Sequence, residues 1–277
     1  MFGTQPIGRW SPERSSAAWQ ASEIAALCLR FREQIFLIRD PNGRIGVGVG
    51  GKFDAKDQGG SGFDVLSILP PLYPEWLGSR EFTELHGLRF AYVSGAMANG
   101  IASVELVEAI AAAGCLGFFG SAGLSLEAVE KALHRLRKSL GPSDGSRPWG
   151  ANLIHSPNEP ELEAAVADLY IRHSVRKVSA AAYMKLTPSV VRYALSGLYL
   201  DEHGVVQRKN YLFAKISRPE VARHFMQPAP RQMVDKLVAE GLITESEGEL
   251  SKRVTVAEDF TVESDSGGHT DNQPLTA

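Results

Sequence analysis

The spacing of apolar residues divides the chain into an irregular first part and a periodic remainder. From residue 88 onward, short apolar runs alternate with stretches in which apolar residues recur every three or four positions, a pattern typical of strands alternating with helices. The strands are expected at 89–93, 115–119, 149–154, 175–181, 211–216 and 259–263. Helices are expected after the first four strands, at 103–113, 125–140, 159–173 and 187–198. Repeated units of this length favour a parallel sheet with right-handed helical crossovers.

Residues 1–87 lack this alternation and are expected to form a small α+β extension. Two β-prone runs flank the turn sequence Arg39-Asp-Pro-Asn-Gly-Arg44, which predicts a β-hairpin over 35–49. The glycines that end this hairpin are followed by 52–62, which is rich in Gly and Asp and is expected to be an exposed loop. A dinucleotide-binding loop requires a helix at that point, so it is not expected here.

Three further segments complete the predicted organisation. A helix is expected within 15–32, and three prolines in 68–78 predict an irregular arm. The interval 218–253 is too long for one crossover and is expected to be a helical insertion. Its short helices are expected at 219–225 and 231–240, with a third after Thr244, whose spacing to Glu247 fits a capping box. The predicted domains are therefore 1–87 and 88–277.

Composition and charge exclude several classes of function. The chain has 277 residues, of which 44% are hydrophobic and 22% charged, as in an ordinary globular protein. A net charge of -3 gives no electrostatic reason for binding nucleic acid or an anionic membrane. Cys28 and Cys115 are the only cysteines, too few for a disulfide framework or a thiolate metal site, and no metal site is predicted. Without a membrane-spanning run or a signal peptide, the expected location is the cytoplasm.

The ends of the predicted strands are where a ligand is expected, because parallel sheets bind ligands at their carboxyl ends. Most of these ends carry small residues, beginning with Ser94-Gly-Ala-Met-Ala-Asn-Gly100, which suits a flat ligand lying against backbone. That segment lacks the G-x-G-x-x-G spacing of a dinucleotide fold, so a barrel is favoured over a doubly wound sheet. A full (β/α)8 barrel needs eight strands. The sequence offers six, so an incomplete barrel is expected.

The last strand runs into Gly267-Gly268-His269. Two residues without Cβ let a ligand approach the backbone closely, and the imidazole that follows can titrate near neutral pH. The alternative for such a sequence is a glycine-rich surface turn followed by a solvated histidine.

Four segments together resemble a known family: 68–78, 93–103, 214–222 and 262–272. They are similar to the trans-acting enoyl reductases of polyunsaturated fatty acid and polyketide synthases, the PfaD family, within the nitronate monooxygenase (2-nitropropane dioxygenase) superfamily of FMN-dependent TIM barrels. The resemblance extends from about Val65 to the end of the sequence. Because that superfamily binds the FMN phosphate after its last two strands, the chain is expected to be C-terminally truncated and not to retain FMN alone.

The resemblance also implies roles for individual residues. The loop Gly95-Ala96-Met97-Ala98 would lie against the flavin, Asn152 and Lys215 would contact it, and Gly267 and Gly268 would bind it. His269 corresponds to the histidine beside the reactive face of the flavin and is the expected catalytic acid. The implied reaction takes a hydride from NADPH, through FMN, to the β-carbon of an enoyl thioester.

The implied partner is an acyl carrier protein, or a synthase module that carries the enoyl chain, and the insertion 218–253 is a candidate docking surface for it. Its cations are Arg218, Arg223, Arg231, Lys236, Lys252 and Arg253. Two alternatives stay open: a nitronate monooxygenase, and an inactive fragment or carrier-docking module. Glu263 is separated from the glycines by Ser-Asp-Ser, which differs from the Glu-Ala-Gly-Gly-His of nitronate enzymes and favours the synthase interpretation.

Overall fold

The computed structural model describes residues 5–13, 17–56 and 62–262. The chain forms two compact units, Met1–Leu77 and Gly78–Ala277. Residues 78–87, which the sequence analysis assigned to the N-terminal extension, group with the second unit. Gly267, Gly268 and His269 lie outside the described residues.

The described residues of the first unit form a five-stranded antiparallel sheet in the order β3-β2-β5-β1-β4. The strands are β1 (Gly8–Ser11), β2 (Ile35–Arg39), β3 (Ile45–Val49), β4 (Lys52–Asp54) and β5 (Phe63–Leu69), accompanied by helix α1 (Ala21–Cys28) and the 3-10 helix η1 (Pro74–Trp76). The predicted hairpin is confirmed as β2 and β3. The expectation of an exposed loop over 52–62 is wrong at its start, where β4 pairs with β1. The expected arm begins inside β5, and α1 is shorter than the predicted helix.

The glycines near β3 make room for two tryptophans. Trp10 is fully buried, and its Nε1 donates a hydrogen bond to the Gly50 carbonyl at 2.6 Å. A Cβ on Gly48 would lie 2.8 Å from the Trp10 ring, and one on Gly46 would lie 2.5 Å from the Trp19 ring. Because real Cβ atoms do not approach other atoms so closely, these positions need glycine for packing.

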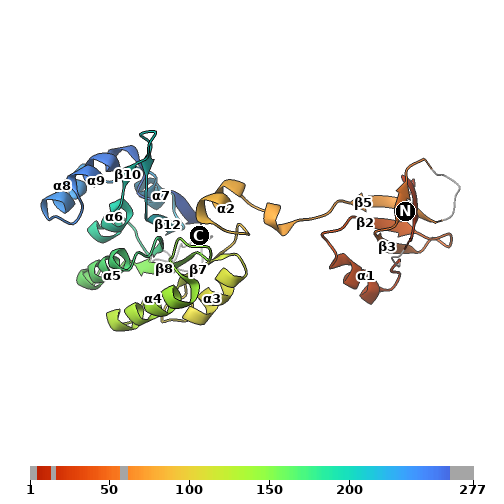
Figure 1. Ribbon diagram of the computed structural model, residues 1–277, viewed down its shortest axis with the longest axis horizontal. Helices are drawn as coiled ribbons and strands as arrows, with labels where there is room; N and C mark the ends of the chain where they lie inside the picture. Colours follow the sequence, from red (N-terminus) through yellow and green to blue (C-terminus); the bar gives the residue numbers. More distant parts are fainter. Residues whose placement is uncertain (1–4, 14–16, 57–61, 263–277) are drawn as a thin grey trace. The chain divides into compact units, whose positions relative to one another are not determined.

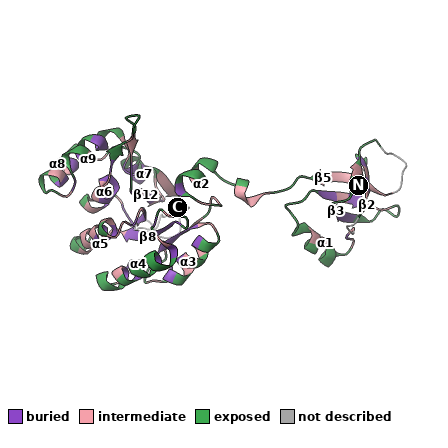
Figure 2. Ribbon diagram, in the orientation of Figure 1, coloured by how far each residue is buried: buried purple, intermediate pink, exposed green. Residues whose placement is uncertain are grey.

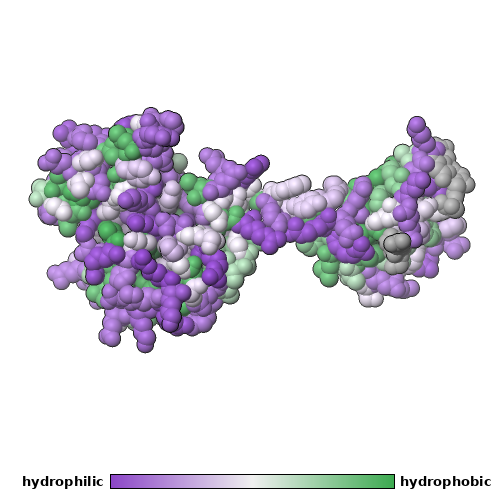
Figure 3. All heavy atoms as spheres, viewed as in Figure 1, coloured by the Kyte–Doolittle hydropathy of each residue, from purple (hydrophilic) through white to green (hydrophobic). Residues whose placement is uncertain are grey.

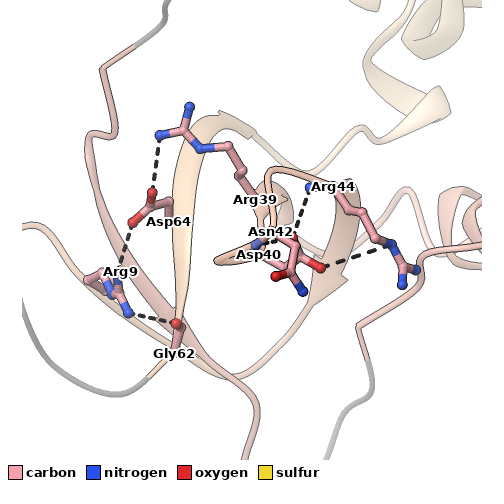
Figure 4. Close-up of polar contacts among 7 residues, drawn as sticks. All are labelled: Arg9, Arg39, Asp40, Asn42, Arg44, Gly62 and Asp64. Carbon is pink, nitrogen blue, oxygen red and sulfur yellow. Dashed lines mark hydrogen bonds and ion pairs between the residues drawn. The ribbon is translucent and has the colours of Figure 1, made fainter.

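Asp64 on β5 joins two arginines from neighbouring strands (Figure 4). Arg9 contacts its Oδ1 at 2.9 Å and also donates to the Gly62 carbonyl at 2.7 Å, and Arg39 contacts Oδ2 at 3.1 Å. Asp40 accepts hydrogen bonds from two backbone N–H groups of the hairpin turn. These contacts fix the strand pairs that surround the Trp10 core.

In the second unit, residues 78–262 form six parallel strands in the order β13-β12-β9-β8-β7-β6. The strands are β6 (Val93–Ser94), β7 (Leu116–Phe119), β8 (Trp149–Ile154), β9 (Lys177–Ala181), β12 (Tyr211–Ile216) and β13 (Asp259–Val262). The helices that connect the first five are α3 (Val104–Ala112), α4 (Leu126–Leu140), α5 (Pro160–Arg172) and α6 (Pro188–Leu195). Neighbours in the sheet are neighbours in sequence, as in a barrel, so the predicted α/β fold with a six-stranded partial barrel is confirmed (Figure 1).

The first barrel strand is shorter than predicted. We expected 89–93, but only Val93 and Ser94 pair with β7. The N–H groups of Arg89 and Phe90 both donate to the carbonyl of Gly114, a turn residue, instead of to a ladder. The apolar run therefore begins before the strand does.

Alternation along the strands separates two faces of this sheet. In β8, Trp149, Ala151 and Leu153 are buried against the helical layer. Gly150 and Asn152 therefore point to the opposite, concave face. The inner sides of helices α3 to α6 are buried and their outer sides exposed (Figure 2).

Helix α2 (Arg80–His86) packs on the concave face at the amino ends of the strands. Ser79 caps its first turn, and Gly87 ends it with φ 68°. The buried His86 ring lies 5.0 Å from the Phe213 ring, and its Nε2 lies 3.1 Å from Asp259 Oδ2 at the start of β13. The sequence analysis did not predict this helix. It covers the amino ends of the strands, and the candidate site lies at the opposite, carboxyl ends.

Between β12 and β13 the predicted helical insertion is present. It contains α7 (Pro219–Phe225), α8 (Arg231–Ala239), α9 (Glu245–Leu250) and the 3-10 helix η2 (Ser251–Arg253). The capping box of Thr244 and Glu247 at α9 is confirmed. A short hairpin of β10 (Tyr199–Leu200) and β11 (Val206–Gln207), which the sequence did not predict, precedes β12.

Lys177, at the start of β9, is a buried cation whose removal should stabilise the fold. Burial lowers its pKa from 10.5 to about 8, although Asp144 and Asp259 oppose the shift. Holding this charge at neutral pH costs about 3 kcal/mol. We expect Lys177→Met to raise the free energy of unfolding by about 1–3 kcal/mol at pH 7, measured by urea denaturation.

The stability gained by Lys177→Met should depend on pH. Between pH 8 and 10.5 the unfolded chain binds more protons at Lys177 than the folded protein, so wild-type stability rises with pH and the advantage of Lys177→Met shrinks. Lys131→Met, on the exposed side of α4, is the matched control and should change stability little from pH 7 to 10.5. A Lys177→Met gain that stays constant from pH 7 to 10.5 would contradict this account.

Candidate functional site

The loop after β6 presents exposed backbone at the carboxyl edge of the sheet. Gly95, Met97 and Ala98 are exposed and Ala96 is half-buried. A Cβ on Gly95 would meet nothing within 4 Å, so this glycine is not required by packing within the described protein. The segment therefore offers an open surface of small residues, where a flat ligand can approach the main chain.

The same loop is joined to the loop after β7 by main-chain contacts. Gly100 N donates to the Gly120 carbonyl, and Gly120 N donates to the Ala102 carbonyl, both at 2.9 Å. A Cβ on Gly120 would lie only 1.7 Å from the Met97 carbonyl oxygen. Gly120 is thus the position that allows the two loops to pack, and it holds the exposed segment in place.

Asn152 lies on the concave face near the end of β8, where sequence analysis placed it. Its Nδ2 donates to the Ser179 carbonyl of β9 at 3.0 Å, and only 5% of the residue is exposed. Its own carbonyl accepts from Ser121 Oγ at 2.6 Å and lies 2.6 Å from the Tyr170 hydroxyl. Burial raises the pKa of Tyr170, which keeps this hydroxyl protonated as a donor. Asn152 therefore bridges β8 and β9 as well as facing the site.

Lys215 shares the concave face with Asn152. It is half-buried and pairs in register with Thr261 of β13, two positions after the buried Phe213. Strand alternation places Phe213, Lys215 and Thr261 on the same side of the sheet. Of the predicted site residues that the structure describes, the sheet brings Gly95 to Ala98, Asn152 and Lys215 to one edge. The other three, Gly267, Gly268 and His269, follow β13 beyond the described part.

A buried carboxylate next to this edge was missed by the sequence analysis. Glu163, in the first turn of α5, is 3% exposed. Its Oε2 lies 2.9 Å from His155 Nδ1 and accepts from Ser156 N–H at 3.1 Å, while its Oε1 accepts from the Thr187 hydroxyl. His155 follows β8 and Thr187 caps α6, so Glu163 connects the loops after β8 and β9.

Tyr183 completes this network. Its ring stacks on His155 with centroids 5.3 Å apart, and burial together with the charge of Glu163 raises its pKa well above the ordinary value. The signal available in the sequence was His155 directly after a strand, with an acid in the first turn of the next helix. The contacts to Thr187 and Tyr183 depend on the adjacent βα unit and carry no local signal.

Removing the Glu163 carboxylate should destabilise the loops after β8 and β9. We expect Glu163→Ala to lower the free energy of unfolding by about 3 kcal/mol, because the part-buried hydroxyl of Thr187 and ring nitrogen of His155 lose their partner. Glu161→Ala removes an exposed acid from the same helical turn and should change stability by less than about 0.5 kcal/mol. Equal urea midpoints for the two variants would show that the Glu163 contacts contribute nothing.

No protein-family model matches the chain. It is 45% identical over 197 residues to the polyketide biosynthesis protein PksE of Bacillus subtilis, covering 71% of this chain and 25% of the relative. It is 44% identical over 209 residues to one of the polyunsaturated fatty acid synthase subunits of Thraustochytrium sp., covering 76% of this chain and 14% of the relative.

Among solved structures, the enoyl reductase domain of MlnA, from the macrolactin biosynthesis cluster of Bacillus amyloliquefaciens, is 38% identical with a TM-score of 0.65. The match covers 68% of this chain and 43% of that chain. The chain spans a quarter or less of the length of its curated relatives. The predicted resemblance to proteins of polyketide and polyunsaturated fatty acid synthesis is thereby confirmed. Within the described part of the chain, no helix has the length and apolar character needed to cross a membrane.

Proposed function

We propose, from the homology of this chain to enoyl reductase domains of polyketide and polyunsaturated fatty acid synthases, that it is part of an FMN-dependent enoyl reductase. NADPH would be the hydride donor and an enoyl thioester on an acyl carrier protein the substrate. The observation that carries the proposal is the match of fold and sequence to the MlnA enoyl reductase domain. The proposed site for this reaction is formed by the strand-end residues.

The residues at the strand ends fit a flavin. Bound FMN would supply hydride transfer between NADPH and the β-carbon of the enoyl thioester. The exposed backbone of Gly95 to Ala98 could lie against its ring, and Lys215 could offset negative charge. Because Asn152 Nδ2 already donates to Ser179, its Oδ1 is the atom we assign to accept a hydrogen bond from the flavin. Gly267 and Gly268 would add two N–H donors beyond β13.

His269 is the proposed acid of the reaction. Hydride addition to the β-carbon leaves negative charge on the α-carbon and the thioester oxygen, and a proton must reach the α-carbon to complete the reduction. A protonated imidazole can give up its proton near neutral pH. The histidine would lose one proton in each turnover and regain it from solvent.

We propose an acyl carrier protein as the partner. The homology to synthase proteins supports this proposal more strongly than the charge of the insertion 218–253 does. Arg231, Lys236 and Lys252 each form an ion pair with an acid three or four positions away. Their charges are therefore largely compensated locally. A carrier protein would have to be recognised by shape and apolar contacts as well as by charge.

Substrate preference tests the proposal. The protein that carries this sequence, loaded with FMN, should oxidise NADPH when an enoyl thioester is added and should not oxidise a nitroalkane. A crotonyl thioester of pantetheine is a suitable minimal substrate, with the saturated butyryl thioester as its matched control. Oxidation of the nitroalkane without NADPH consumption on the enoyl thioester would favour the nitronate monooxygenase alternative.

A further inference from the structure

Two imidazoles and a carboxylate meet on the outer surface of α4 and α5. Glu130 and His134 lie one turn apart on α4, and His173 is the residue that ends α5. Glu130 Oε1 lies 2.8 Å from His173 Nε2, and the rings of His134 and His173 meet edge to face with centroids 4.9 Å apart. We propose that these three side chains form a binding site for a divalent transition-metal ion such as Zn²⁺.

The donor set determines the class of ion. Two imidazole nitrogens and one carboxylate oxygen suit Zn²⁺ and its neighbours, whereas Mg²⁺ and Ca²⁺ prefer oxygen ligands alone. One ligand atom from each of the three residues lies within 4.8 Å of the other two. To bind the ion, the side chains would have to rotate until these atoms reach the separation of tetrahedral ligands, with water in the fourth position.

The site is largely preformed. The 3.6-residue repeat of α4 places Glu130 and His134 on the same side of the helix. The imidazole of His173 is 17% exposed and contacts the Glu130 carboxylate. The backbone carbonyl of His173 accepts a hydrogen bond from Arg137 at 3.5 Å. The Glu130 carboxylate is 42% exposed, so an ion can enter from solvent.

The surrounding charges set the strength of the site. Lys131, Arg135 and Lys138 lie along the same surface of α4, which Figure 3 shows to be hydrophilic. Arg135 is paired with Glu105 at 2.6 Å, which offsets part of this positive charge. The remaining cations weaken a metal site, so affinity must come from the direct ligands.

The location of the site indicates a structural effect. Its three ligands belong to α4 and α5 in the outer helical layer, whereas the proposed flavin site lies on the concave face of the sheet, so the ion would not take part in the reaction. A bound ion would tie α4 to α5 and stabilise the helical layer. This inference does not depend on the proposed enoyl reductase activity.

Zinc titration by calorimetry tests the site in the metal-free protein. We expect Zn²⁺ to bind and to raise the melting temperature by about 5 °C when its concentration is 100-fold above Kd. His134→Ala and His173→Ala should each weaken zinc binding by at least about tenfold and abolish most of the thermal shift. His203→Ala is the matched control, because His203 is exposed beside a single acid, Glu202, and should leave binding unchanged.

His134 is exposed, so its alanine variant is expected to fold, which circular dichroism would confirm. Zinc binding of equal affinity in wild type, His134→Ala and His173→Ala would show that the ion is held elsewhere and would overturn the proposal. No measurable binding of Zn²⁺ to the wild-type protein would overturn it equally.

Discussion

Replacing His269 with alanine is expected to lower kcat for enoyl reduction by about 10²- to 10⁴-fold, the range that positioned acid catalysis contributes. The affinity for FMN should stay nearly unchanged, because the proposed role of the imidazole is to give a proton to the α-carbon. The measurement is kcat with a crotonyl thioester, together with FMN affinity from fluorescence titration of the same protein.

The pH profile separates an acid from a structural residue. Wild-type kcat should fall as pH rises through the range in which histidine titrates, and His269→Ala should lack this limb. His203→Ala, which removes an exposed imidazole, should behave as wild type. Parallel losses of FMN affinity and kcat in His269→Ala would assign the histidine a structural role.

Gly120→Ala is expected to disrupt the candidate site from within the fold. The added methyl would lie 1.7 Å from the Met97 carbonyl oxygen, a backbone atom that cannot rotate away. The loop after β6 must therefore move, at a cost of about 3 kcal/mol in the free energy of unfolding. Since that loop is the proposed flavin surface, FMN affinity should fall as well.

Gly95→Ala is the matched control for this prediction. Its methyl would meet nothing within 4 Å, so stability should stay close to that of wild type. If the flavin lies against this loop, however, FMN affinity should still fall, because the methyl occupies the space proposed for the ring. Gly120→Ala with wild-type stability would contradict the packing argument, and Gly95→Ala with wild-type FMN affinity would contradict the placement of the flavin.

The six-stranded parallel sheet could be predicted because most of its units have a strong local pattern, although the first strand is shorter than its apolar run. The amphipathic helix α4 is an example in which period alone identifies the element, and the run Trp149 to Ile154 is recognised as a buried strand by its short length. The capping box of Thr244 and Glu247 could also be predicted, because its two residues are only three positions apart in the sequence. Because carboxyl ends of parallel strands meet at one edge, the prediction that Asn152 and Lys215 lie at the same edge of the sheet followed from the same pattern.

The elements that were missed depend on distant contacts. Trp10 of β1 packs against Phe36 and Phe63, residues that no local pattern connects to it. Strand β4 has only three residues and is stabilised by pairing with β1, so its Gly- and Asp-rich surroundings suggested a loop. The role of Glu163 likewise becomes visible only when the loops after β8 and β9 are side by side.

Product analysis after one anaerobic turnover tests the proposed enoyl reductase function most directly. The protein that carries this sequence, loaded with FMN and reduced with one equivalent of NADPH, is mixed with a crotonyl thioester, and the thioesters are identified by mass spectrometry. We expect one equivalent of butyryl thioester. When the transferable hydrogen of NADPH is deuterium and the turnover is faster than exchange with solvent, the product should carry one deuterium at its β-carbon. Unchanged crotonyl thioester beside fully oxidised NADPH would contradict the proposed function.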